Sequence, residues 1–152
     1  MTQNLQSTIE SAWDNRASLS ASTAPAEVRD AVEHVIAELD SGRLRVATRE
    51  AVGQWTVHQW IKKAVLLSFR LRDNEIMCAG DLHFYDKVPP KYTNLSAEEM
   101  AATGVRVVPP AMVRRGSYVA KGAILMPFFF NDAASADIYT LSLPGALPIS
   151  CA

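Results

Sequence analysis

The stretch GVRVVPPAMVRRGSYVAKGAILMP, residues 104–127, repeats an aliphatic side chain every six positions. The repeating residues are Val107, Val113, Val119 and Leu125. The fourth position after each holds, in turn, Ala111, Ser117, Ala123 and Phe129, of which the first three are small. This period fits neither an α-helix, which repeats about every 3.6 residues, nor an ordinary strand, which alternates. It is typical of a chain wound as a triangular prism, with one hexad on each side and the aliphatic residues inside.

The hexads therefore predict that residues 104–130 begin a left-handed parallel β-helix. Gly116 and Gly122 support this prediction, because they occupy equivalent places in successive hexads, where a turn often needs a positive φ. Three or four hexads amount to little more than one coil, whereas a solenoid generally needs at least about three repeats. Periodicity alone also leaves open two ordinary strands, VRVV and YVAKGAILM, joined by a turn.

The residues before the hexads contain several helical patterns. Apolar residues at steps of three and four predict helices at about 3–16, 25–39 and 58–70. A capping-box pattern, Ser-Ala-Glu-Glu, predicts a shorter helix over 96–104 that ends at a glycine. These helices, with the strands described next, predict an α+β N-terminal domain over residues 1–103.

Strand patterns lie between the helices. Alternating residues over 44–48 predict a half-buried strand, and residues 55–57 form a possible hairpin partner beyond Gly53. Residues 76–85 are also rich in β-forming side chains.

Composition narrows the function classes. The chain has 152 residues, and its 15 basic and 16 acidic side chains give a net charge of −1, which favours neither nucleic acid nor an anionic membrane as a partner. Cys78 and Cys151 lack the spacing of a metal site, so no metal is expected. The N-terminus has no signal-peptide pattern and no apolar run is long enough to span a bilayer, so we expect a cytoplasmic protein without a membrane anchor.

Four separated strings carry a family resemblance. They are LDSGRLRVA at 39–47, QWTVHQWIKKAVLLSFRLRDN at 54–74, FYDKVPPKY at 84–92 and the hexad stretch at 104–127. In this order and spacing the chain resembles the bacterial 2,3,4,5-tetrahydropyridine-2,6-dicarboxylate N-succinyltransferases over about residues 1–130. The resemblance implies a homotrimer whose active sites lie between neighbouring prisms. It also implies transfer of a succinyl group from succinyl-CoA, a cosubstrate, to a dicarboxylate acceptor in lysine biosynthesis, with no bound cofactor.

The same resemblance singles out Arg106. This arginine, in GVRVVPP, matches the position at which the family places an acceptor-binding arginine, and a guanidinium pairs with a carboxylate in a bidentate way. Because Val105 and Val107 flank it, Arg106 is expected to point away from the core that they enter. Arg114 and Arg115 are interpreted as a solvated turn, with anion attraction as the alternative. His34, His58 and His83 have no acid or nucleophile at a recognisable spacing and are expected to be structural or exposed.

Beyond Pro127 the chain departs from the family. The family continues with further hexads and an acidic motif whose aspartate acts at the acceptor site, and this sequence has neither, so no catalytic residue is assigned. We interpret residues 131–152 as an aberrant tail, and neither Asp132 nor Asp137 inherits the role of the aspartate. The chain is therefore expected to be inactive by itself. A non-catalytic binding or oligomerisation module derived from the enzyme remains the alternative.

Overall fold

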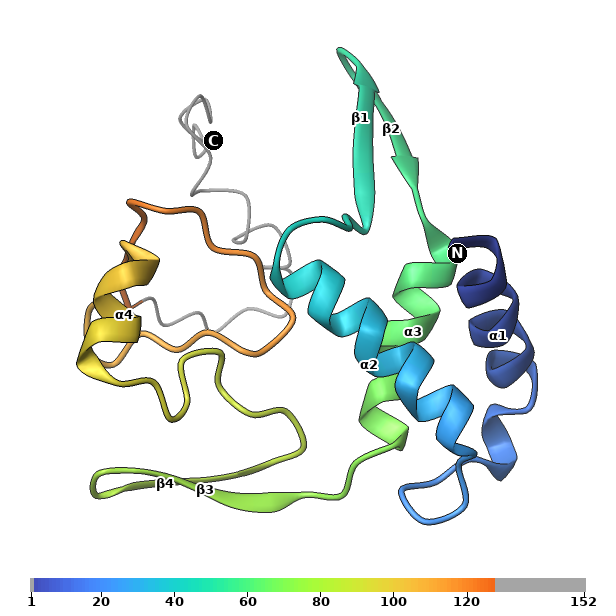
Figure 1. Cartoon of the computed structure of the whole chain (residues 1–152), viewed down its shortest axis with the longest axis horizontal. Coiled ribbons are helices and arrows are strands. Elements are labelled where there is room, and N and C mark those ends of the chain that lie inside the picture. The colour runs from blue at the N-terminus through green and yellow to red at the C-terminus, as the bar shows by residue number, and fades with distance from the viewer. Residues whose placement is uncertain (1, 128–152) are drawn as a thin grey trace, which may run out of the picture. The chain divides into compact units, whose positions relative to one another are not determined.

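The computed structural model describes residues 2–127 and divides into two compact units (Figure 1). The helical unit contains the residues up to Lys91 together with Arg114–Tyr118. The second unit contains residues 92–113 and continues from Val119. The tail interpreted as aberrant, residues 131–152, lies outside the described residues.

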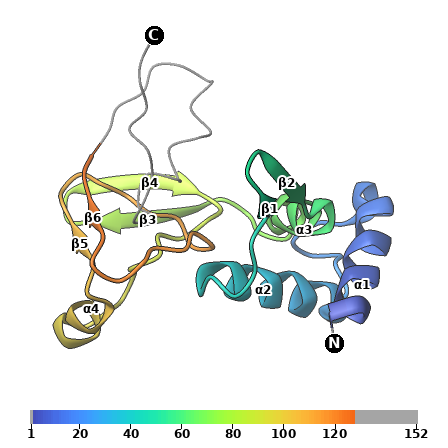
Figure 2. The ribbon, with the colours of Figure 1, turned by 90° about the horizontal axis from the view of Figure 1, so that it is seen from above.

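Three helices build the core of the helical unit: α1 (Thr2–Asp14), α2 (Ala26–Asp40) and α3 (Gln59–Arg70), with a 3-10 turn η1 (Arg16–Ser18) after α1 (Figures 1 and 2). Apolar residues at helical spacing face one another and exclude water. Among the described residues, the buried core consists of Ile9, Ala12, Ala24, Ala31, Val32, Val35, Ile36, Leu39, Trp60, Ile61, Ala64, Leu67 and Leu71. The three predicted helices are confirmed. Pro25 is the N-cap of α2 and not its first residue.

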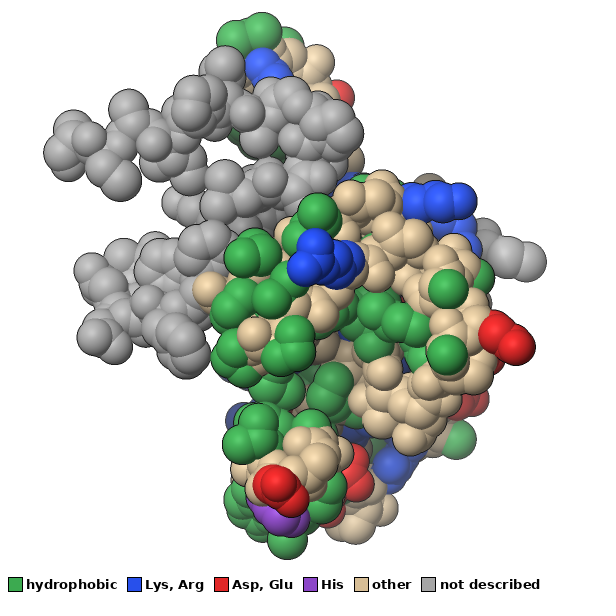
Figure 3. Space-filling model, turned by 90° about the vertical axis from the view of Figure 1, so that its left-hand side faces the viewer, with side chains coloured by type: hydrophobic (Ala, Val, Ile, Leu, Met, Phe, Trp, Pro, Cys, Tyr) green, Lys and Arg blue, Asp and Glu red, His purple; other side chains and the backbone are tan. Residues whose placement is uncertain are grey.

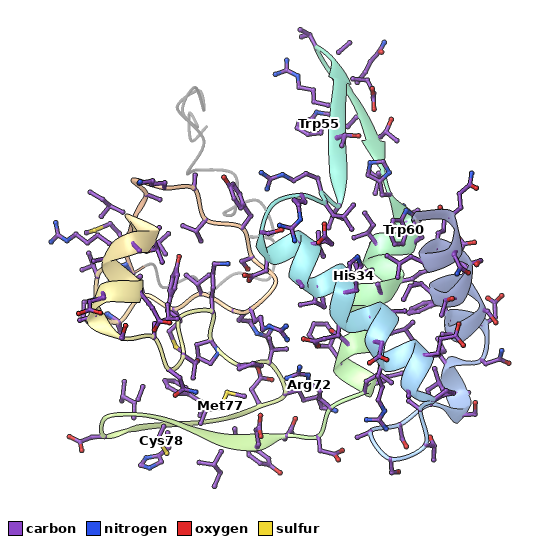
Figure 4. The ribbon with its side chains drawn as sticks, viewed as in Figure 1. His34, Trp55, Trp60, Arg72, Met77 and Cys78 are labelled. Carbon is purple, nitrogen blue, oxygen red and sulfur yellow. The ribbon has the colours of Figure 1, made fainter. Side chains whose placement is uncertain are left out.

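The first hairpin begins later than predicted. Strands β1 (Ala47–Ala51) and β2 (Gln54–Val57) pair antiparallel, with Arg49 opposite Trp55, so the predicted partner strand is confirmed. The strand predicted from Leu44 is wrong at its start, because Leu44 packs against the helical core and Val46 is exposed. Figure 4 shows the result for the tryptophans: Trp60 lies among the helices, whereas Trp55 stands on the hairpin.

A second hairpin follows α3. Strands β3 (Glu75–Ala79) and β4 (Leu82–Asp86) pair antiparallel, so the β-forming stretch 76–85 is a hairpin whose turn the sequence pattern had not indicated. Met77 and Phe84 lie on its part-buried face, and Ile76 and Tyr85 are exposed on the other.

The capped helix is confirmed as α4 (Ala97–Thr103). The Ser96 hydroxyl accepts a hydrogen bond from the Glu99 backbone N–H at 3.2 Å, and the Glu99 carboxylate accepts one from the Ser96 N–H at 2.7 Å. These bonds hold the pKa of Glu99 below its usual value. Gly104, in the left-handed conformation, ends the helix.

Two short strands, β5 (Arg106–Val107) and β6 (Ile124–Leu125), pair in parallel. Arg106 lies opposite Ile124 and Val107 opposite Leu125, an offset of 18 residues, which equals three hexads. Two strands joined by a turn would pair antiparallel, so that alternative is wrong. Gly116 and Gly122 have φ of +95° and +84°, as their places in the hexads predicted. The α+β N-terminal part is confirmed, but residues 2–127 contain no stacked β-helix.

None of the helices between residues 2 and 127 is both long and apolar enough to cross a membrane. The predicted boundary at residue 104 coincides with the end of α4 and, as a division into domains, stays a prediction.

Candidate functional site

Arg106 is held on β5 by the backbone that follows α4. The Thr103 hydroxyl accepts a hydrogen bond from the Val105 N–H at 3.1 Å, and the Arg106 N–H donates to the Ala123 carbonyl at 3.0 Å. Val105 and Val107 are part-buried, whereas Arg106 is exposed. The backbone of Arg106 is therefore fixed and its side chain extends into solvent.

The guanidinium of Arg106 differs from the others in the chain. Every other arginine has a side-chain hydrogen bond, ion pair or ring contact: Arg16, Arg29, Arg43, Arg45, Arg49, Arg70, Arg72, Arg114 and Arg115. Among residues 2–127, the Arg106 side chain has none. An exposed guanidinium without an internal carboxylate keeps its donors available for an anionic ligand.

The two neighbouring arginines, Arg114 and Arg115, are instead paired within the helical unit. Arg114 forms a 2.5 Å ion pair with Asp86, and Arg115 pairs with Glu33, which Arg72 also contacts at 3.2 Å. Backbone N–H donation from Lys87, and then Arg114, lowers the pKa of Asp86. Attraction of an external anion by this pair would have to compete with these carboxylates.

The histidines do not form a catalytic arrangement with the described residues around them. His34 and His83 are exposed. The Nε2 atom of His58 lies 3.1 Å from the Thr48 hydroxyl, which itself donates to the Glu50 carboxylate at 3.2 Å. Which of the two atoms donates depends on the tautomer of His58, so this contact by itself does not define a base that activates a nucleophile.

A groove of about 400 Å³ opens between α1 and α2. It is lined by Asn4, Leu5, Thr8, Glu27, Ala31, His34, Glu38 and Leu44. The Glu38 carboxylate is taken by Arg43 through hydrogen bonds of 2.6–3.1 Å, which lower the pKa of Glu38. Glu38 is thus already paired within the helical unit.

Sequence patterns missed a cluster around Asp40, at the end of α2. Its Oδ1 accepts a hydrogen bond from the Gly116 N–H at 2.8 Å, and its Oδ2 accepts one from Lys91 Nζ at 2.5 Å. Gly116 is 76 residues away in sequence, so no local motif could have identified this contact.

Residues 2–127 contain no group of three or more His, Cys, Asp or Glu residues arranged to hold a metal ion. Cys78 is an exposed free thiol, and Cys151 lies outside the described residues.

The described residues thus form a helical domain followed by a short parallel β pairing, and Arg106, on the first of these two strands, has no side-chain partner among residues 2–127. Residues 4–71 match the family model of the tetrahydrodipicolinate N-succinyltransferase N-terminal domain.

Relatives extend the similarity beyond that domain. The chain is 78% identical over 131 residues to a 2,3,4,5-tetrahydropyridine-2,6-dicarboxylate N-succinyltransferase of Acidovorax sp. (strain JS42), which covers 86% of this chain and 48% of the relative. Proteins of the same name from Variovorax paradoxus (strain S110) and Burkholderia multivorans (strain ATCC 17616 / 249) are 71% and 59% identical over 134 and 138 residues. These matches cover 88% and 90% of this chain and 48% and 50% of the relatives. The chain thus spans about half the length of the relatives it matches.

Proposed function

We propose that the protein to which this chain corresponds is an N-succinyltransferase of lysine biosynthesis, which moves the succinyl group of succinyl-CoA to tetrahydrodipicolinate. The name shared by relatives up to 78% identical supports this activity. In this proposal the whole protein is a cytoplasmic homotrimer, as the family resemblance implies, and the chain contributes its N-terminal domain and the first part of its repeat domain.

Residues 104–127, in this proposal, form the first coil of a left-handed parallel β-helix. The parallel pairing of β5 with β6 supports it, since an offset of 18 residues is one circuit of a prism with three six-residue sides. The part-buried state of Val107, Val113, Val119 and Leu125 fits inward-facing positions that a second coil would cover.

Arg106 would bind a carboxylate of the acceptor. The observation that supports this role is its exposed guanidinium, which has no partner among residues 2–127, on a backbone fixed by β5. A planar guanidinium can donate two parallel hydrogen bonds to one carboxylate, which orients the acceptor as well as attracting it.

The transfer itself needs groups beyond Arg106. The acceptor nitrogen must lose a proton before it attacks the thioester carbonyl, and the carbon–sulfur bond then breaks to release CoA as its thiol. No described residue is assigned as the proton acceptor. We therefore expect the 152-residue chain alone to release no thiol from succinyl-CoA in the presence of acceptor.

A chimera tests the proposal directly. Residues 1–127 of this chain would be joined to the part of the Acidovorax relative that this chain does not span. We expect acceptor-dependent thiol release from succinyl-CoA by the chimera. A folded chimera without this activity, but with a defined oligomeric state, would favour the module alternative.

Arg106→Ala in the chimera separates the role of this residue from the function as a whole. Loss of a charge-assisted contact of about 1.5–3 kcal/mol predicts a rise of roughly 10- to 100-fold in KM for the acceptor, with little change in KM for succinyl-CoA. Arg106→Lys should recover part of the loss, and Arg49→Ala, on the exposed β1 strand, is the matched control. An unchanged acceptor KM in Arg106→Ala would remove Arg106 from the site and leave the enzyme assignment intact.

A further inference from the structure

Residues 114–118 lie midway along the chain between β5 and β6, and the end of α2 holds them in the helical unit. Asp40 accepts the Gly116 N–H at 2.8 Å and the Lys91 ammonium at 2.5 Å, and Lys91 also donates to the Asp40 backbone carbonyl at 3.1 Å. The Lys91 and Asp40 side chains are only 13% and 29% exposed. Reduced solvent screening makes such a pair stronger than a surface ion pair.

Further contacts fix both ends of the same segment. At one end, Arg115 pairs with Glu33 and its backbone N–H donates to the Pro89 carbonyl at 3.0 Å. At the other end, the Tyr118 ring lies so close over Gly42 that a Cβ there would be 2.6 Å from its Cδ2 atom. The Arg45 guanidinium stacks on that ring at 4.3 Å. We call these contacts on residues 114–118 the α2 clamp.

The β5–β6 ladder, by contrast, is stabilised by few contacts. Its backbone bonds run from the Arg106 N–H to Ala123 at 3.0 Å and from the Val108 N–H to Leu125 at 2.9 Å, with a further bond from the Gly122 N–H to Gly104 at 2.9 Å. None of residues 92–127 is buried. A two-stranded ladder without a covered face is marginal in water, and closing the loop between its strands costs conformational entropy.

We infer that the C-terminal end of α2, through Asp40, is a template for this first turn of the repeat: by fixing residues 114–118, the α2 clamp lowers the entropic cost of pairing β5 with β6. When residues 114–118 are fixed, the connection between β5 and β6 contains two short free segments in place of one long free loop. Less conformational entropy is then lost when the two strands pair. The template is independent of the acyltransferase activity proposed above, since it uses neither Arg106 nor any substrate.

Amide hydrogen exchange on the 152-residue chain, followed by NMR, tests the template residue by residue. In Asp40→Ala we expect at least about tenfold faster exchange at Gly116 and at the ladder amides of Arg106, Val108 and Gly122. Core amides of α1–α3 should change by less than about twofold. Asp40→Asn keeps an acceptor for the Gly116 N–H but loses the charge, so its effect should be smaller. Glu38→Gln, which removes another ion-paired carboxylate of α2, is the matched control and should leave the ladder unchanged.

Two results would overturn the inference. One is faster exchange at Gly116 with unchanged exchange rates at the ladder amides. Releasing residues 114–118 would then have no effect on the pairing of β5 with β6. The other is an unchanged exchange rate of the Gly116 amide in Asp40→Ala. If Asp40→Ala instead loosens α2 as a whole, Tyr118→Ala replaces it, since Tyr118 is 39% exposed and lies outside the helical core. Tyr118→Ala should then speed exchange at the ladder amides of Arg106, Val108 and Gly122. Unchanged exchange rates at these amides would contradict the template.

Discussion

The two units of the chain differ in how completely they bury their apolar side chains. All buried side chains among residues 2–127 lie between Ile9 and Leu71, in the helical unit. Among residues 92–113 and 119–127 of the second unit, all are part-buried or exposed, with Met112, Ile124 and Met126 each more than half exposed. Figure 3 shows apolar side chains open on the surface. The three-helix core covers its own apolar faces, whereas residues 92–113 and 119–127 leave theirs at least partly exposed.

The largest expected effect comes from a cavity in the helical core. Leu67 is fully buried on α3, so Leu67→Ala should lower the free energy of unfolding by about 2–5 kcal/mol. The adjacent Leu66 is 41% exposed, and Leu66→Ala, the matched control, should cost less than about 1 kcal/mol. Urea unfolding followed by far-UV circular dichroism measures both.

The same experiment extends to the second unit. Val107→Ala removes a part-buried hexad residue and should leave the helical unfolding transition within about 0.5 kcal/mol of the parent. A loss as large as that of Leu67→Ala would mean that the two units share one cooperative core, and the comparison between them would fail.

A matched pair of glycines tests the contact between the end of α2 and Tyr118. Gly42 and Gly53 have nearly equal φ, +79° and +76°, so alanine at either costs about 1–2 kcal/mol in backbone strain. Of these two glycines, only Gly42 has a close neighbour: a Cβ added there would clash with the Tyr118 ring. Nothing lies within 4 Å of a Cβ added at Gly53. Gly42→Ala should therefore cost roughly 1–3 kcal/mol more than Gly53→Ala in the same unfolding assay. Equal losses would show that the ring moves aside freely.

The parts of this fold that the sequence predicted are the local ones. The helices follow from residues three and four apart, and the capping box at Ser96 and Glu99 is a contact between near neighbours. The strand expected from Leu44 failed because a long-range contact with the helical core overrides the alternating pattern.

In the candidate site, too, the sequence pattern did not reveal the long-range contacts. The position of Arg106 was indicated by a family resemblance. Its lack of a side-chain partner among residues 2–127 depends on the three-dimensional placement of the carboxylates, which the sequence pattern does not give. The contacts of Arg115 with Glu33 and of Gly116 with Asp40 join segments more than 70 residues apart, and no pattern within either segment specifies the other.

A small effect is expected from the pH dependence of Glu33, which links α2 to the segment 114–118. The hydrogen bond from Arg115 is the main cause of a lowered pKa, the charges of Arg115 and Arg72 act in the same direction, and partial burial opposes them. A carboxylate with a lowered pKa in the folded state stabilises that state above its ordinary pKa of 4.5, and this contribution is lost as the pH falls through the folded value. Because the Glu33 side chain is 46% exposed, screening keeps the contribution below about 1 kcal/mol.

Glu33→Gln isolates this contribution. The difference in unfolding free energy between parent and variant should be present at about pH 7 and should be lost as the pH falls through the lowered pKa of the folded parent. A difference that persists unaltered at low pH would mean that Glu33 acts through packing, and the ion pair with Arg115 would then contribute no charge-dependent stability to the segment that the helical unit holds.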